Sequence, residues 1–237
     1  MECFQNSICS LLKRFLPVAA AIAVLSGIAD PAFAGKADST GVTADAARIL
    51  LNCTAGAVGT VCADGSVYAG ISPDGNVPMY VQRCDYSQTW NGRICIYQSK
   101  SRGAKRSLTW NDGSNKWVDT PLVNCDSADA CDNSGETNTA TLTATDSSTD
   151  AGFQPHAAAA YCNGLAENGH DDWYLPSAPE LKVIYANKAA IKNFNVSGQP
   201  YWSSSENVVL YAWQMSGEDN QNPVYKTNEQ FVRCARR

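Results

Sequence analysis

Two histidines and a run of three serines are the residues of this sequence best suited to acid–base or nucleophilic chemistry. They are His156, His170 and Ser203 to Ser205. A catalytic serine needs a base beside its hydroxyl, and many hydrolases place it in a G-x-S-x-G turn, which does not surround these serines. We find no acid, base and nucleophile at a recognisable spacing, so the sequence favours binding over catalysis. We expect no enzyme activity and no cofactor.

Metal ligands are the next chemistry to consider. The carboxylates of Asp126, Asp129, Asp132 and Glu136 could offer hard oxygen ligands to calcium. Their spacing is not that of an EF-hand, and a solvated acidic loop is the preferred interpretation. No C-x-x-C pair occurs, and neither histidine stands at zinc-finger spacing from a cysteine pair. The prediction is that the protein has no metal site.

The N-terminus has the pattern of an export signal. Lys13 and Arg14 precede a short apolar run, and Ala32-Phe33-Ala34 is a small-x-small cleavage site. We therefore predict a signal peptide over residues 1–34 and no stable membrane insertion after its removal, since the apolar run is short and contains proline and glycine. The expected location is bacterial: secreted, periplasmic or at the cell surface.

Eight cysteines remain after residue 34, an even number that indicates disulfides in an exported protein. Spacing between neighbours suggests three local bridges, and the last two cysteines would then tie a helix to the end of the chain. Eight cysteines allow many other pairings, so the connectivity stays open at this point. The suggested pairs are Cys53–Cys62, Cys84–Cys95, Cys125–Cys131 and Cys162–Cys234.

The charge balance argues against nucleic acid as a partner. The chain has 18 Lys and Arg against 23 Asp and Glu, a net charge of −5, which removal of residues 1–34 does not change. Binding to polyanions needs basic clusters, and the segment Lys100 to Arg106 is the one run that qualifies.

The chain after the leader divides into a β-rich part, an irregular part and a helical part. We expect a short helix over residues 44–51, a hairpin through the Pro73 to Asn76 turn, and a second tight turn at Asn91-Gly92. The alternating stretch Asn138 to Thr145 predicts a strand. Apolar periodicity predicts helices over 155–167 and 178–192, the second starting at the Ser177/Glu180 capping box.

The last 66 residues carry three distinctive blocks, D-W-Y-L-P-S-A-P-E-L from Asp172, Y-W-S-S-S-E from Tyr201, and F-V-R-C-A-R-R from Phe231. In this order they resemble the C-terminal domain family of a bacterial collagen-like adhesin (the Lcl C-terminal domain). The resemblance covers roughly residues 105–237. It implies an α+β, C-type-lectin-like fold with two helices and antiparallel strands, with residues 35–104 as an N-terminal elaboration of one helix and a β-hairpin.

The resemblance also implies an adhesin, since the relatives contact sulfated polysaccharides and host surfaces. This chain lacks a collagen-like repeat and has a negative charge, which weakens the expectation for polyanions. Trp110-Asn111-Asp112 spells the W-N-D of calcium-dependent lectins, but it precedes both helices and no E-P-N or Q-P-D accompanies it. We interpret it as a turn with Trp110 buried.

A candidate ligand surface lies in the C-terminal loops, where tyrosine, asparagine and serine are frequent. This composition offers aromatic contact at low entropy cost and adaptable hydrogen bonds. The expected ligand is a glycan or a protein surface, and the oligomeric state stays open. The candidate residues are Glu206, Asn207, Tyr211, Glu218, Asp219, Asn220, Asn222, Tyr225, Lys226 and Asn228.

Two further hypotheses compete with an adhesin. A structural or assembly component of a pilus or envelope complex would use the same surface against a protein partner. A retroelement-diversified binding protein would vary residues in this C-terminal region, and adenine-rich codons at the candidate asparagines and tyrosines would distinguish it.

Overall fold

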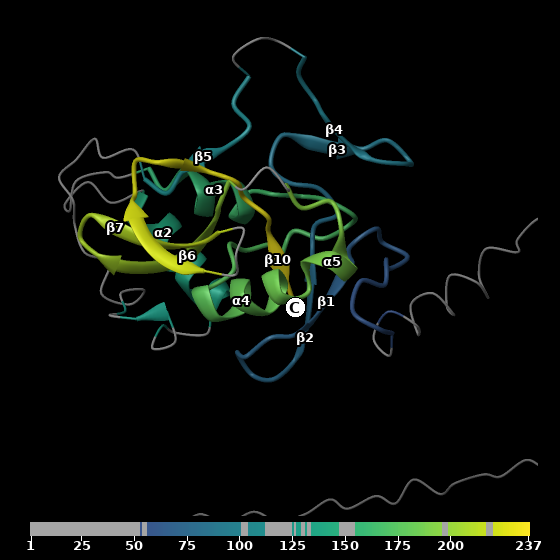
Figure 1. The fold of residues 1–237 in the computed structure, drawn as a ribbon, viewed down its shortest axis with the longest axis horizontal. Helices are drawn as coiled ribbons and strands as arrows, with labels where there is room; N and C mark the ends of the chain where they lie inside the picture. Colours follow the sequence, from purple (N-terminus) through teal and green to yellow (C-terminus); the bar gives the residue numbers. More distant parts are fainter. Residues whose placement is uncertain are drawn as a thin grey trace, which may run out of the picture. The chain divides into compact units, whose positions relative to one another are not determined.

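The structure is a computed structural model, and its described part is one compact unit within residues Thr40–Arg237 (Figure 1). It describes residues 53, 56–100, 104–111, 125, 127–128, 131, 134–146, 155–195, 199–216 and 220–237. The expected signal peptide and the expected helix over 44–51 lie outside these residues. In the part of the chain that is described, no helix is long and apolar enough to cross a membrane.

One sheet joins the N-terminal hairpin to the C-terminus. Strands β1 (Val67–Ile71) and β2 (Pro78–Val81) pair antiparallel, which confirms the expected hairpin. Strand β10 (Ala235–Arg236) then pairs with β2, giving the order β1-β2-β10. The hairpin that precedes the family-like region is therefore hydrogen-bonded to the last residues of that region.

The second three-stranded sheet contains half of the candidate residues. Its strands are β6 (Tyr201–Val208), β7 (Tyr211–Met215) and β8 (Gln221–Tyr225), in the order β6-β7-β8. Two smaller antiparallel ladders pair β3 (Gln88–Trp90) with β4 (Cys95–Tyr97), and β5 (Leu108–Thr109) with β9 (Glu229–Gln230).

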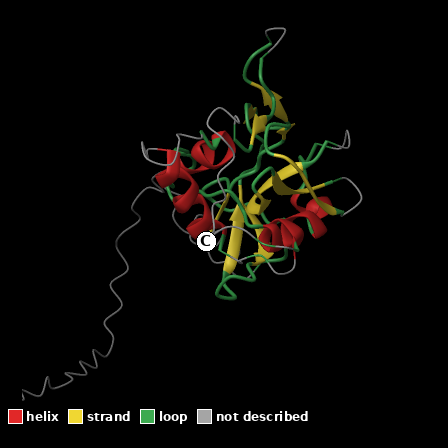
Figure 2. Cartoon of the chain, turned by 90° about the vertical axis from the view of Figure 1, so that its left-hand side faces the viewer, coloured by secondary structure: helices red, strands yellow, loops and turns green. Residues whose placement is uncertain are grey.

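Four helices accompany the strands in the described residues: α2 (Gly135–Asp146), α3 (Ala157–Asn163), α4 (Ala178–Ala186) and α5 (Lys188–Ile191). Figure 2 shows them as separate helices around the strands. The two helices expected over 155–167 and 178–192 are present, although the first is shorter and the second is divided at Asn187. The capping box of Ser177 and Glu180 is formed as predicted. The molecule is thus an α+β protein.

The strand expected over Asn138 to Thr145 is wrong, because this stretch lies inside helix α2. The buried side chains are Asn138, Thr139 and Leu142, a spacing of a helical turn. Thr143 satisfies its hydroxyl by donating to the carbonyl of Thr139, four residues earlier, at 3.0 Å. Tertiary burial of one helical face therefore outweighed the strand preference of alternating threonines.

All four suggested disulfides are confirmed by the structure. The longest loop is closed by Cys162–Cys234, which joins α3 to the residue before β10 across a sequence separation of 72. Both cysteines are fully buried in the main apolar cluster with Trp110, Trp202 and Leu142. This bridge holds the helical part of the chain to its C-terminus.

The carboxyl group of Glu180, in the first turn of α4, is fully buried and accepts hydrogen bonds from several segments of the chain. One of its carboxylate oxygens accepts from the backbone N–H groups of Gly135 and Ser177, both at 3.0 Å. The other accepts from the hydroxyls of Ser72 at 2.7 Å and Tyr174 at 2.9 Å. Because Gly135 begins α2 and Ser177 caps α4, a single carboxylate lies at the N-termini of two helices, where a negative charge is favoured. It also ties both helices to the end of β1.

Candidate ligand-binding surface

An exposed row of side chains crosses the end of the β6-β7-β8 sheet. The register pairs Val208 with Tyr211 and Tyr211 with Tyr225, so one residue from each strand lies in the row. The two tyrosine rings are 4.6 Å apart between centroids and tilted by 34°. Val208 is 42% exposed and Tyr225 is 50% exposed. We call Val208, Tyr211 and Tyr225 the tyrosine row.

Hydrogen bonds to Cys125 hold the strands that carry the tyrosine row. Trp213, two positions along β7 from Tyr211, faces the same side of the sheet and donates its indole N–H to the carbonyl of Cys125 at 3.2 Å. Asn207 donates to the same carbonyl at 3.2 Å. Since Cys125 is bridged to Cys131 and its own N–H bonds to the carbonyl of Glu206, the disulfide fastens this end of the sheet. The tyrosine row is therefore presented on a rigid support.

Tyr225 affects the titration of its neighbour Tyr211. A hydrogen bond between the phenols raises the pKa of Tyr211, with smaller contributions from partial burial and from the charge on Tyr225. The phenol of Tyr211 is therefore neutral at physiological pH, and the row combines apolar ring surface with hydroxyl groups.

The structure brings together only part of the sequence-predicted set. Asn207 and Asn228 belong to the neighbourhood of the tyrosine row, because Asn207 adjoins Val208 and Asn228 closes the turn after Tyr225 through its N–H. Asn220 and Asn222 lie at the other end of β8, where Asn222 accepts from Gln214 at 3.3 Å. Glu218 and Asp219 lie outside the described residues.

Glu206 and Lys226 must be removed from the surface set. Both side chains are fully buried and form an ion pair with each other. The ammonium of Lys226 also lies 4.8 Å from the centre of the Trp110 ring, which is itself 1% exposed. Taking two charges out of water requires such pairing, so these residues support the sheet from within and cannot meet a ligand at its surface.

The residues considered for catalysis have structural contacts. His156 is 1% exposed and packs edge-on against Trp110. His170 contacts Asp64 at 3.0 Å and Asp172 at 3.6 Å. The hydroxyls of the three serines are fully buried: Ser203 donates to the carbonyl of Trp213, Ser204 accepts from Asn138, and Ser205 accepts from the N–H of Ala178.

The acidic loop proposed as the alternative calcium site is only partly described. Asp126, Asp129 and Asp132 lie outside the described residues. Glu136 is in the first turn of α2 and forms an ion pair with Arg237. Within the described ranges no cluster of three or more His, Cys, Asp or Glu side chains could hold a metal ion.

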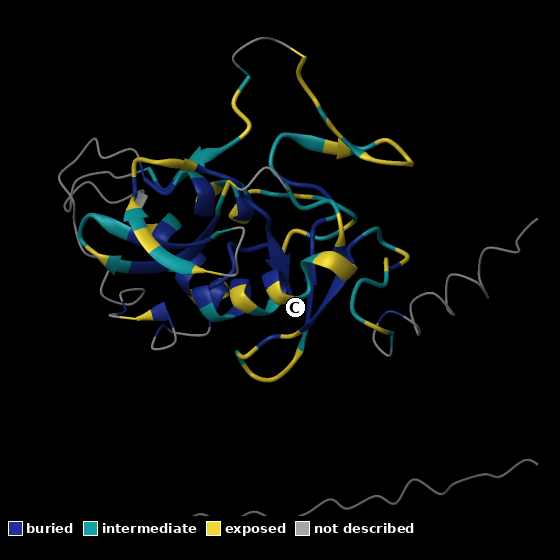
Figure 3. Cartoon of the chain, in the orientation of Figure 1, coloured by how far each residue is buried: buried dark blue, intermediate teal, exposed yellow. Residues whose placement is uncertain are grey.

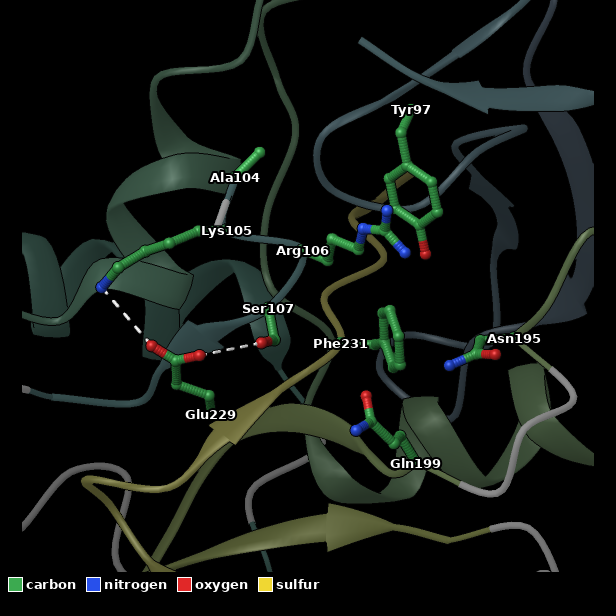
Figure 4. Close-up of a pocket in the computed structure, with 9 residues that line it drawn as sticks. All are labelled: Tyr97, Ala104, Lys105, Arg106, Ser107, Asn195, Gln199, Glu229 and Phe231. Carbon is green, nitrogen blue, oxygen red and sulfur yellow. Dashed lines mark hydrogen bonds and ion pairs between the residues drawn. The ribbon is translucent and has the colours of Figure 1, made fainter. Parts of the chain in front are cut away.

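Sequence reasoning missed a polar cleft of about 690 Å³ (Figure 4). Its lining comes from β4, the segment 104–107, β9 and residues near Asn195, and Phe231 lies among the polar side chains. Lys105 pairs with Glu229 at 3.4 Å, and the guanidinium of Arg106 stacks on Tyr97 at 4.1 Å. The basic run ending at Arg106 is the sequence feature that could have pointed to this cleft. The distant partners Tyr97, Asn195 and Gln199 carry no motif.

Comparison with known families gives one assignment. The family model described as the Lcl C-terminal domain matches residues 102–236, more than half of the chain. The matched region contains the tyrosine row, the cleft residues from Ala104 onward and the Cys162–Cys234 bridge. No curated protein matches the chain at a significant level.

Proposed function

Because the chain belongs to the Lcl C-terminal domain family, we propose that it is an exported, non-enzymatic binding protein of the adhesin type that uses the tyrosine row as its contact surface. The observation that carries the proposal is the pairing of Tyr211 with Tyr225 on the fastened end of a sheet. The expected ligand is a glycan or a protein surface.

The chemistry of the row supports this role. Two rings and a valine offer apolar contact area, while two phenols and the nearby exposed amide of Asn228 offer hydrogen bonds. Tyrosine loses few rotamers on binding, and a rigid support lowers the entropy cost further. Affinity would come from shape and hydrogen bonding, without a metal ion.

A C-type-lectin-like arrangement is part of the same proposal. Helices α3 and α4, the antiparallel β6-β7-β8 sheet and a disulfide from α3 to the C-terminal segment support it. Export is supported by the leader pattern and by the four disulfides, which persist in oxidising compartments.

The test is binding of the oxidised chain, residues 35–237, to a glycan array that includes sulfated polysaccharides and to immobilised candidate surface proteins. Tyr225→Ser and Tyr211→Ser should each weaken binding by about 2 kcal/mol, roughly 30-fold, as expected for an aromatic contact residue. Tyr225→Phe keeps the ring and should lose less. Addition of a chelator should leave binding unchanged.

The matched control is Ile71→Ser, because Ile71 is 42% exposed on β1, outside the tyrosine row. It should bind like the parent chain. Equal binding by the parent and both tyrosine variants would reject the row as the contact surface. Binding abolished by chelator would instead indicate a metal-dependent site.

A further inference from the structure

The β3–β4 hairpin presents apolar side chains to solvent. Figure 1 shows it on the side of the described unit away from β6 and β7, and Figure 3 shows an exposed tip. Ile94 is 53% exposed and Ile96 is 43% exposed, and Ile96 is paired across the ladder with exposed Thr89. Cys84–Cys95 bridges the segment before β3 to β4, so these isoleucines are held on a short cross-linked support.

The same segment concentrates positive charge. Residues 83–106 contain six of the chain's 18 basic residues and one of its 23 acidic residues. That acidic residue, Asp85, is 1% exposed and is neutralised by Arg233, whose Nε donates to it at 2.6 Å. The segment therefore has a local charge of +5, while the rest of the chain has −10. The overall negative charge conceals this asymmetry.

Aromatic rings position two of these cations on the face of the β3–β4 ladder opposite Ile96, because Trp90 and Tyr97 alternate with Thr89 and Ile96 along their strands. Arg83 lies 3.5 Å from the centre of the Trp90 ring, and Arg106 lies 4.1 Å from that of Tyr97, as Figure 4 shows for the second pair. In the described part of the chain, Arg83, Arg93, Lys100 and Arg106 form no ion pair with a carboxylate. Guanidinium groups stacked on rings remain able to bind phosphate oxygens through their N–H groups.

We propose that the β3–β4 hairpin docks tip-first on an anionic lipid surface, with Ile94 and Ile96 entering the boundary between headgroups and acyl chains, and with Arg93, Lys100 and the two ring-stacked arginines contacting lipid phosphates. Isoleucine side chains gain from an apolar phase, and basic residues gain from anionic headgroups. A soluble polyanion offers phosphate or sulfate groups but no apolar phase, so the exposed isoleucines next to Arg93 in the tip favour a lipid surface. The contact is peripheral and does not cross the bilayer.

The experiment is sedimentation of the oxidised chain with vesicles of phosphatidylcholine alone and of phosphatidylcholine with phosphatidylglycerol. The parent should bind only the anionic vesicles. Ile94→Ser combined with Ile96→Ser should reduce partitioning at least tenfold, and Arg93→Gln about fivefold. Ile94→Leu combined with Ile96→Leu preserves apolar area and should bind like the parent.

Two measurements separate this proposal from its rivals. Ile71→Ser removes an isoleucine elsewhere that is about as exposed as Ile96 and should bind vesicles like the parent. Dextran sulfate serves as a soluble polyanion. Parent chain that binds dextran sulfate but neither type of vesicle would overturn the proposal, as would vesicle binding that survives both the serine pair and Arg93→Gln. Because Arg93 lies in the exposed tip, its variant tests the proposal even if the serine pair fails to fold.

Discussion

Glu180→Ala is expected to lower the free energy of unfolding by about 4 kcal/mol, since it leaves several buried donors without an acceptor at roughly 1–3 kcal/mol each. The donors are the N–H groups of Gly135 and Ser177 and the hydroxyls of Ser72 and Tyr174. Urea unfolding of the oxidised protein, followed by tryptophan fluorescence, measures the effect. Loss of less than about 1 kcal/mol would show that water or rearranged side chains replace the carboxylate.

Glu180→Gln separates the charge of this residue from its shape. Burial is the largest influence on the Glu180 carboxyl and raises its pKa, against the opposing effect of its hydrogen bonds, so the folded protein holds the proton more tightly than the unfolded chain does. The resulting stabilisation is complete below the unfolded-state pKa of Glu and is lost as pH rises through the raised value. The unfolding free energy of the parent should therefore fall relative to that of Glu180→Gln as pH rises from acid toward neutral.

Replacing both Cys162 and Cys234 with alanine is expected to cost about 4 kcal/mol. The bridge closes a loop with a sequence separation of 72, and its loss frees the unfolded chain to explore many more conformations. Both residues are fully buried, so alanine is preferred to serine because it introduces no unpaired hydroxyl. Thermal and urea unfolding of the purified variant give the measurement.

The matched control is replacement of Cys125 and Cys131 with alanine. That bridge spans a separation of only 6, and the same chain-entropy reasoning gives about 2 kcal/mol. Equal losses for the two pairs would mean that local packing, rather than the length of the closed loop, determines what each bridge contributes.

The sequence predicted the parts of this fold that depend on local signals. Glycine and asparagine turns located the β1–β2 hairpin, and the Ser177/Glu180 spacing located the start of α4. Cysteine spacing suggested all four bridges. Helix α2 was mistaken for a strand because its Thr and Ala residues alternate, while its helical face becomes visible only once Asn138 and Leu142 are seen to be buried.

The candidate site was predictable only in part, because its residues come together through tertiary contacts that no local pattern specifies. Tyr211 and Tyr225 are 14 positions apart, and their contact depends on the register of β7 and β8, which no local pattern specifies. Glu206 and Lys226 look like surface residues in the sequence, since isolated charges usually face water. Their mutual pairing across the sheet reverses that expectation. The hairpin cations were likewise hidden by the net charge of the whole chain.

The pairing of β10 with β2 also constrains the order of events during folding. Residues 235–236 complete the sheet that begins at residue 67, so that sheet cannot close until the C-terminus has emerged. The Cys162–Cys234 bridge must wait for the same moment. Contacts between residues this distant in sequence slow folding. The chain loses the entropy of the intervening loop before these contacts form and stabilise it. For the exported protein proposed above, this delay would keep the chain unfolded during passage through a membrane channel and would place formation of the final cross-link on the far side.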